Sequence, residues 1–379
     1  MVPPQGRRSE LAVFLPSLDG GGAEIVMLRL AGGFAERGIA TDLVVARAVG
    51  ELVDEVPPGV RLVDLAARSP VVATKTLGLA RYLRTRRPRA LVAALDIVNA
   101  GAVARTLAQA PTRVVLSTHT HLTRQFDDKP DHGVALVRRA LVRGLYPRAD
   151  ALVAVSRGVA DDVAAMAGID PGQVTVIPNP IVTPELERLA GEPADHPFLG
   201  DDGPPVILGV GRLVRQKDFA TLVRAFARVR AQHEARLLIL GVGDPREAQT
   251  EAELRALIDE LGVGADVDLA GWRANPHAYM ARASVFALSS RYEGFGNVVA
   301  EALAVGTPVV STDCQSGPAE ILEGGRYGRL VPVGDAEALA RGIVATLADP
   351  PDQAHLRRRA DRYRTQQIVG EYLTVINGT

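Results

Sequence analysis

Val206-Ile-Leu-Gly-Val-Gly-Arg-Leu-Val-Arg-Gln-Lys-Asp218 joins an apolar run to a loop of glycines and cations. The apolar run predicts a buried strand, and the apolar spacing after Asp218 predicts a helix. Glycine allows a tight turn and a close approach to a ligand, and the N–H groups at a helix start favour anions. Arg212 and Lys217 could therefore meet an anionic ligand, although two solvated loop cations explain these residues equally well.

The same alternation of apolar runs and helical spacing fills both halves of the 379-residue chain. Continuous apolar strands separated by helices predict parallel sheets that are covered on both faces. Prolines and polar residues between positions 174 and 205 interrupt the pattern. The predicted strands are 11–15, 42–46, 90–94, 113–117 and 151–155 before the interruption, and 206–210, 236–240, 267–270, 285–288 and 308–311 after it.

These patterns predict an α/β protein with two doubly wound, Rossmann-like domains that face each other across a cleft. We place the first domain at residues 1–180 and the second at residues 181–352. Residues 353–379 have helical spacing and no strand after them, so we expect a C-terminal helix that crosses back to the first domain. Ligands of such domains bind at the carboxyl ends of the strands.

Composition narrows the class of protein. Aromatic residues make up 4% of the chain, which argues against a carbohydrate-binding module built on aromatic platforms. The single cysteine, Cys314, cannot form an internal disulfide, and no signal peptide is evident, so we expect a cytoplasmic protein. Residues 1–180 contain 22 Lys and Arg against 17 Asp and Glu, whereas residues 181–379 contain 21 against 27. The basic first half suggests an anionic partner.

A second group of polar residues follows the predicted strand 285–288. Gly294 and Gly296 predict a loop, and residues 297–305 predict a helix. Glu293 would lie in the loop and Glu301 about one turn into the helix. Two carboxylates are good acceptors for the vicinal hydroxyls of a sugar or ribose. A helix start that favours one acid would explain either carboxylate alone, but not the whole group.

His119 follows a predicted strand and is a candidate substrate contact at the carboxyl edge of the first sheet. His121 lies two residues further on, and the sequence does not decide between the two. No carboxylate or cysteine lies close enough in sequence to complete a metal site with them. The pair Asp266 and Asp268 has the spacing of a short acidic metal motif, but it lies at a strand entry, and we expect no metal there.

The second half closely resembles the family 4 glycosyltransferases, which have the GT-B architecture. The resemblance rests on an ordered set of motifs, which are Val210-Gly-Arg-Leu with Gln216-Lys217, Gly241-Val-Gly-Asp244, Gly271-Trp-Arg-Ala-Asn-Pro276, the segment 293–301, and Gly306-Thr-Pro-Val-Val-Ser-Thr-Asp313 with Ser316-Gly-Pro-Ala-Glu320. The first half matches more loosely, through Gly20-Gly-Gly-Ala-Glu24, Ser156-Arg-Gly-Val159 and Pro178-Asn-Pro180.

The resemblance implies a role for each candidate residue. Arg212 and Lys217 would hold the donor diphosphate, and Glu301 would accept from the ribose hydroxyls. Glu293 and His119 would contact the donor sugar. The remaining contacts would be the backbone of Gly294, Phe295, Gly296, Asn297 and Val298 at the sugar, Trp272 and Arg273 around the base, and Gly21 and Gly22 over the phosphates.

The implied activity is retaining transfer of a hexose or N-acetylhexosamine from a nucleotide diphosphate sugar, taken to be a UDP-sugar, to an acceptor hydroxyl. The acceptor would be a lipid-linked or polysaccharide precursor. No metal and no other cofactor is expected, and no nucleic-acid partner. Two alternatives keep the fold: a GT-B phosphorylase or epimerase, and a non-catalytic nucleotide-sugar-binding protein.

A basic and apolar surface is expected on the first domain. Arginines cluster in residues 81–89 and 136–148, and residues 134–145 also supply an apolar helical face. Such a face could bind anionic lipid headgroups as a peripheral membrane contact. An ordinary amphipathic helix with solvated charges is an equally simple interpretation.

Overall fold

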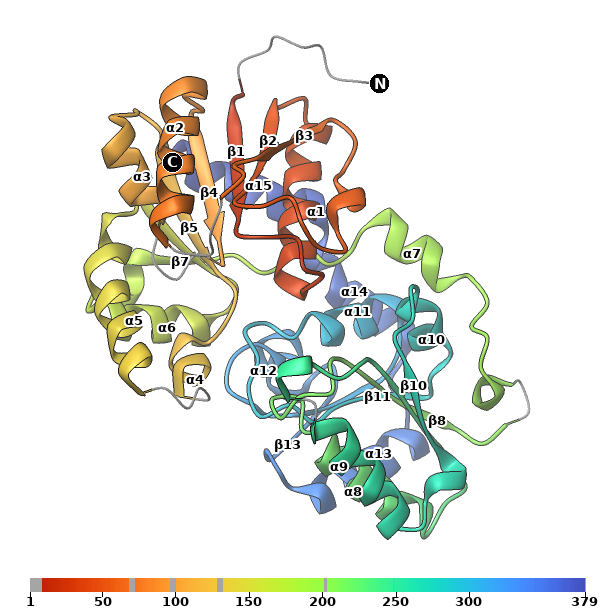
Figure 1. Cartoon of the computed structure of the whole chain (residues 1–379). Coiled ribbons are helices and arrows are strands. Elements are labelled where there is room, and N and C mark those ends of the chain that lie inside the picture. The colour runs from red at the N-terminus through yellow and green to blue at the C-terminus, as the bar shows by residue number, and fades with distance from the viewer. Residues whose placement is uncertain are drawn as a thin grey trace. The chain divides into compact units, whose positions relative to one another are not determined.

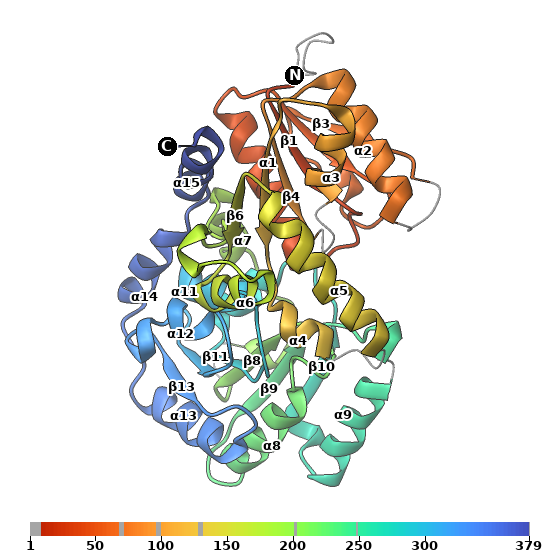
Figure 2. The same cartoon turned by 90° about the vertical axis from the view of Figure 1, so that its left-hand side faces the viewer.

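The computed structural model describes residues 9–67, 72–95, 100–127, 132–200, 203–247 and 249–378 (Figures 1 and 2). The chain forms two compact units. The first consists of the residues up to Pro180 together with those from Thr365 onwards, and the second is Ile181–Arg364. The division after Pro180 coincides with the predicted boundary.

The first unit is built on a parallel sheet of seven strands in the order β3-β2-β1-β4-β5-β6-β7. Apolar strands such as Leu11-Ala-Val-Phe-Leu15 are buried along their whole length, as expected for a sheet covered on both faces. The strands are β1 Leu11–Leu15, β2 Thr41–Val45, β3 Val60–Asp64, β4 Ala90–Ala94, β5 Arg113–Thr118, β6 Ala151–Ala154 and β7 Val174–Val176. The helices are α1 Gly22–Glu36, α2 Val72–Arg86, α3 Ala100–Ala108, α4 Leu122–Asp127, α5 His132–Leu145, α6 Arg157–Ala167 and α15 Thr365–Asn377.

The second unit repeats this plan with six parallel strands in the order β10-β9-β8-β11-β12-β13. The two sheets together bear out the predicted α/β class with doubly wound sheets. The strands are β8 Val206–Val210, β9 Arg236–Leu240, β10 Val267–Gly271, β11 Val285–Leu288, β12 Val309–Thr312 and β13 Arg329–Val331. The helices are α7 Pro184–Ala190, α8 Phe219–Arg230, α9 Gln249–Glu260, α10 Pro276–Arg282, α11 Asn297–Val305, α12 Pro318–Ile321, α13 Ala336–Ala348 and α14 Gln353–Ala360.

The predicted return of a C-terminal helix to the first domain is confirmed, but residues 353–379 do not form one unbroken helix. Helix α14 ends at Ala360, the turn Asp361–Tyr363 follows, and Arg364 is extended, with φ −64° and ψ 132°. The reason is that this segment pairs with the other connection between the units. The N–H groups of Ile181 and Val182 both donate to the Tyr363 carbonyl, at 2.9 and 3.0 Å. A helix could not offer its backbone in this way.

Only α15 joins the first unit, where it packs on α1 (Figures 1 and 2). Its side chains Ile368, Val369, Tyr372 and Ile376 are buried in the core of that unit. The two helices approach closely at Gly33 of α1, where an added Cβ would lie 2.5 Å from Cγ2 of Val369. Helix α15 thus completes the core of the first unit.

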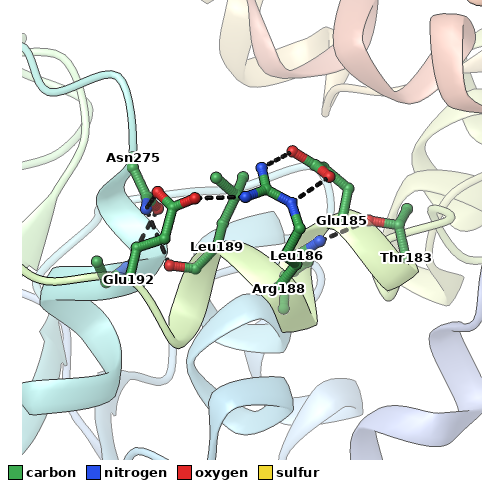
Figure 3. Close-up of polar contacts among 8 residues, drawn as sticks. Thr183, Glu185, Leu186, Arg188, Leu189, Glu192 and Asn275 are labelled. Carbon is green, nitrogen blue, oxygen red and sulfur yellow. Dashed lines mark hydrogen bonds and ion pairs between the residues drawn. The ribbon is translucent and has the colours of Figure 1, made fainter.

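Helix α7 follows the first connection and is bound to the rest of the second unit by Asn275 (Figure 3). The Asn275 Nδ2 group donates to the carbonyl of Leu189, at 2.9 Å, and to Oε2 of Glu192, at 3.0 Å. Its Oδ1 accepts from the Ala278 N–H at 3.2 Å and so caps α10. One side chain therefore fixes both the end of α7 and the start of α10.

Glycines allow three loops to pack against one another at the carboxyl edge of the second sheet. Gly211 follows β8, Gly241 follows β9, and Gly271 ends β10. The Gly211 N–H donates to the Leu240 carbonyl and the Gly241 N–H to the Gly271 carbonyl, both at 2.9 Å. Gly241 has a φ of +150°, and a Cβ added there would lie 1.8 Å from the Gly211 carbonyl oxygen. The backbones are too close for any other residue at this position.

We predict that Gly241→Ala destabilises the second unit by about 3 kcal/mol or more, because backbone atoms must move to admit the methyl group. Gly262→Ala is the matched control, since Gly262 also has a positive φ, +65°, but no atom lies within 4 Å of its added Cβ. The control should cost only about 1–2 kcal/mol. Thermal unfolding of both variants measures the difference, and equal melting temperatures would contradict the close packing.

Candidate functional site

The strand order places the predicted cationic loop and the predicted acidic loop side by side. In the second sheet, β8 pairs with β9 on one side and with β11 on the other, so the direction of winding reverses between β8 and β11. Ligands of doubly wound sheets bind at the carboxyl edge where this reversal occurs. Lys217 lies in the loop after β8 and Glu293 in the loop after β11.

Lys217 and Glu293 form an ion pair, with Nζ 2.6 Å from Oε1. The side chains are only 18% and 8% exposed. The hydroxyl of Ser290 donates to the same oxygen at 2.7 Å. A buried carboxylate needs such partners, because transferring an unpaired charge from water is costly. Both contacts are made to Oε1 of Glu293, and the ion pair uses one of the three N–H donors of Lys217.

Arg212 also has an acidic partner. Its Nη1 lies 2.9 Å from Oδ2 of Asp244, whose side chain is buried, while the arginine side chain is 58% exposed. Asp244 ends the motif Gly241-Val-Gly-Asp244 after β9, and no role was predicted for it. Its position directly after a strand is the sequence feature that could have identified it as a site residue. The two predicted cations, Arg212 and Lys217, are therefore each anchored by a carboxylate.

Hydrogen bonds tie the loop after β8 to the loop after β11. The Gln216 side chain donates to the Tyr292 carbonyl at 2.9 Å, and the Arg291 N–H donates to the Gln216 carbonyl at 2.8 Å. The Ser289 hydroxyl donates to the carbonyl of Lys217 at 2.8 Å. Because these bonds use backbone atoms, sequence spacing alone could not reveal them. They hold the ammonium and the carboxylate in fixed positions.

Helix α11 begins directly after this loop, at Asn297 as predicted. Its N-cap is Gly296, with φ +91°, and no side chain caps the helix. Gly294 and Phe295 are buried, and the Phe295 ring packs edge-on against Tyr363 at 5.3 Å. Phe295 can therefore offer a ligand its backbone but not its ring. Asn297 and Val298 are partly exposed.

The acidic residue of α11, Glu301, is largely buried and faces His277 of α10. Trp272 and Arg273 lie in the loop that joins β10 to α10. The Trp272 side chain is 65% exposed. Arg273 is held in place, since its Nε donates to the Tyr279 hydroxyl at 3.2 Å and its Nη1 to the Trp272 carbonyl at 3.1 Å. These residues all belong to the second unit.

His119 lies at the carboxyl end of β5 in the first unit and is part of a hydrogen-bond chain. Its Nε2 is 2.9 Å from the Ser117 Oγ, which in turn is 2.7 Å from the Tyr372 hydroxyl of α15. His121 is instead turned to α6, with Nδ1 3.3 Å from the Asp162 carboxylate. This contact gives His121 a structural role and favours His119 as the candidate ligand contact.

His119 also lines a small cavity of about 60 Å³ beside β5. Two polar atoms of its lining, Nδ1 of His119 and Oε1 of Gln125, are buried and have no hydrogen-bond partner among the described residues. A cavity of this size can hold a small polar group or water. Gly21 and Gly22 lie at the carboxyl edge of the same sheet, where Gly21 is the N-cap of α1 and has no side chain to cap it.

The acidic motif at 266–268 takes part in structural ion pairs. Asp266 binds Arg230 at 2.6 Å and also Arg236, and Asp268 accepts from His196 at 2.8 Å. Across the residues with described positions, no three His, Cys, Asp or Glu side chains gather in a way that could hold a metal ion. Burial raises the pKa of the Cys314 thiol to about 12, so that side chain packs as an uncharged group.

Two family models match the chain, one in each half. Residues 20–184 match the Glycosyltransferase Family 4 model, and residues 193–363 match the Glycosyl transferases group 1 model. A relative 36% identical over 215 residues is the N-acetylgalactosamine-N,N'-diacetylbacillosaminyl-diphospho-undecaprenol 4-alpha-N-acetylgalactosaminyltransferase of Campylobacter jejuni, with 57% of this chain and 55% of that protein covered. Another, 32% identical, is the lipopolysaccharide core biosynthesis glycosyltransferase LpsE of Rhizobium meliloti, with 60% and 63% covered. The chain thus spans less than two thirds of the length of either relative.

Solved structures share the fold over nearly the whole chain. The crystal structure of HepE from Anabaena in complex with UDP superposes with a TM-score of 0.77 at 21% identity, covering 98% of this chain and all of that one. Sucrose-phosphate synthase from Thermosynechococcus elongatus gives a TM-score of 0.76, also at 21% identity, with 97% and 98% covered. These likenesses bear out the predicted GT-B fold.

We predict that His119 stays neutral at physiological pH. Burial lowers its pKa to about 4, and the nearby Asn179 side chain opposes the shift only in part. Between pH 6.5 and 4 the unfolded chain binds a proton that the native state does not. The free energy of unfolding therefore falls as the pH drops through this window, and this contribution is constant above it. NMR titration of the imidazole, assigned with His119→Gln, measures the pKa. A midpoint at pH 6 or above would contradict the burial argument.

Proposed function

Because the chain belongs to the family 4 glycosyltransferases of the GT-B fold, we propose that it transfers a hexose or N-acetylhexosamine from a nucleotide diphosphate sugar to an acceptor hydroxyl. We take the donor to be a UDP-sugar and the acceptor to be a lipid-linked or polysaccharide precursor. The name of the Campylobacter relative includes a diphospho-undecaprenol, and HepE was crystallised with UDP, which supports both choices. The proposal includes retention of anomeric configuration, as the family resemblance implies.

The observation that carries the proposal is the ion pair of Lys217 and Glu293 at the carboxyl edge of the second sheet. Lys217 has two further N–H donors for a diphosphate oxygen. Glu293 keeps its second oxygen for the sugar hydroxyls. The bond that breaks joins the sugar to the diphosphate. A cation for the diphosphate and a hydrogen-bond acceptor for the sugar, held 2.6 Å apart, can therefore contact the groups on either side of that bond.

The chemical step needs stabilisation of the leaving group. As the bond between the anomeric carbon and the diphosphate breaks, negative charge grows on the phosphate oxygens. The acceptor oxygen forms the new bond to the anomeric carbon and passes its proton to an oxygen of the leaving diphosphate. Lys217 and Arg212 are held in place before the reaction by Glu293 and Asp244. Fixed charges of this kind lower the barrier because they need little reorganisation. In this proposal they take the role that a divalent metal has in other transferases, and no metal is required.

The alternative activities have less support. A phosphorylase or an epimerase would use the same fold, and a non-catalytic protein could bind the nucleotide alone. The two relatives described above are both named as glycosyl-transferring enzymes, which favours transfer. Detection of free sugar phosphate, or of an epimerised donor, would support the alternatives.

We predict that Arg212→Ala or Lys217→Ala lowers turnover about a hundredfold or more, the usual effect of losing one preorganised charge partner. Donors are first found by a thermal-shift screen of nucleotides and nucleotide sugars, and acceptors by mass spectrometry of extracts incubated with the best donor. Release of UDP then measures turnover. Arg215→Ala is the control, because Arg215 is an exposed cation of the same loop that lines a groove against α8 and α9. Wild-type rates in both site variants would exclude the proposed role.

A membrane contact is proposed for the first unit, at the cytoplasmic face. Its surface on α5 exposes Leu136 and Val137, at 71% and 60%, beside the exposed Arg143. Apolar side chains next to basic ones suit the interface of a membrane with anionic headgroups. No helix in the described parts of the chain is long and apolar enough to cross a membrane, so the proposed contact is peripheral.

We predict that the protein floats with phosphatidylglycerol vesicles at low salt and less so as salt rises, because screening weakens the charge attraction. Leu136→Glu with Val137→Glu should abolish flotation. Leu107→Glu serves as the control, since Leu107 is an exposed leucine of α3 in the same unit. Failure of the wild type to float at any salt concentration would remove the membrane contact and leave the transfer activity untouched.

A further inference from the structure

His277 is a buried histidine that the proposed mechanism does not use. It lies in the first turn of α10 and is 7% exposed. Neither Nδ1 nor Nε2 has a hydrogen-bond partner in the part of the chain that the structure describes. Buried polar atoms without partners are rare and unfavourable, so such a side chain calls for an explanation in function or in a missing partner.

The carboxylate of Glu301 faces this histidine. Nε2 of His277 and Oε2 of Glu301 are 3.8 Å apart, and both side chains are largely buried. This distance is too long for a hydrogen bond but short enough that a small rotation of the carboxylate would make one. Helices α10 and α11 pack against each other, and each begins at the carboxyl edge of the second sheet. Both helices therefore start at the edge of the sheet where the Lys217–Glu293 pair lies.

The start of α10 is held firmly, so His277 has little freedom to move away. Asn275, two residues before it, caps α10 through Oδ1 and binds the end of α7 through Nδ2 (Figure 3). Helix α7 is itself braced by Arg188, which binds both Glu185 and Glu192. The backbone of His277 is therefore held in place and its ring is buried, whereas the longer Glu301 side chain has more rotatable bonds with which to reach it.

We propose that His277 is a positioning residue for Glu301. When the donor binds, Nε2 of His277 donates a hydrogen bond to one carboxylate oxygen of Glu301, and the other oxygen accepts from the ribose hydroxyls. This hydrogen bond orients the carboxylate of Glu301 and gives the buried imidazole of His277 a partner. This inference rests on the proposed function, in which Glu301 binds the ribose.

Calorimetry with two nucleotides tests the role, because only one of them carries the ribose hydroxyls. We expect His277→Phe to weaken UDP binding about tenfold, the effect of losing one charge-assisted hydrogen bond. With 2′,3′-dideoxy-UDP the same variant should change the affinity less than about twofold. His277→Asn keeps a side-chain donor and should recover part of the UDP affinity. His233→Phe replaces an exposed histidine of the same unit and should change neither affinity.

Each outcome separates the inference from the proposed function. Equal losses for both nucleotides, or no loss for UDP, would overturn the positioning role. Glu301→Gln is measured in parallel, and an unchanged UDP affinity in that variant would remove Glu301 from the ribose and the proposed contact with it. If Glu301→Gln weakens UDP while His277→Phe does not, only the inference fails. If His277→Phe does not fold, the ratio of the two affinities in His277→Asn decides, because a purely structural role would lower both equally.

Discussion

The proposed site of this protein depends on one ion pair, between Lys217 and Glu293, and that pair depends on the order of strands in a sheet. The two residues are 76 positions apart in the chain and 2.6 Å apart in space. They meet because β8 and β11 are neighbours at the point where winding reverses, so that the loops after both strands leave the sheet at one place. Neither charge could be buried alone. Each residue offsets the cost of burying the charge of the other. The hydrogen bonds between the loop after β8 and the loop after β11 hold the two loops in fixed positions.

Much of this could be foreseen from the residues, because apolar runs and helical spacing mark a doubly wound sheet clearly. All five strands expected after the interruption are present, as is the helix that begins at Asn297. The strands that were missed are short or lie toward the edges of their sheets. Strand β13 has three residues, and β3 is interrupted by Arg61, which binds Asp42 of the neighbouring strand. A charge inside a strand breaks the apolar run by which a strand is identified.

The candidate site and the C-terminal segment were less accessible from sequence, each for a physical reason. Spacing identified the cations and the acids separately, but the pairing of Arg212 with Asp244 depends on how far two loops extend beyond their strands. The C-terminal segment was misjudged because helical spacing continues through residues 361–364, whereas the backbone there is needed to pair with residues 181 and 182. Tertiary hydrogen bonds can interrupt a helix that its own residues would allow.

The helix α15 has a consequence for biosynthesis. Its buried side chains and the Tyr372 hydroxyl behind Ser117 and His119 belong to the first unit, yet in the chain they follow the whole second unit and leave the ribosome after it. A domain normally folds as its own residues emerge. Here the first unit stays incomplete, with part of its core open, while residues 181–364 of the other unit are made. Any factor that protects nascent chains would find its substrate in that interval, and a chain cut off before residue 365 would leave the first unit, not the second, incomplete.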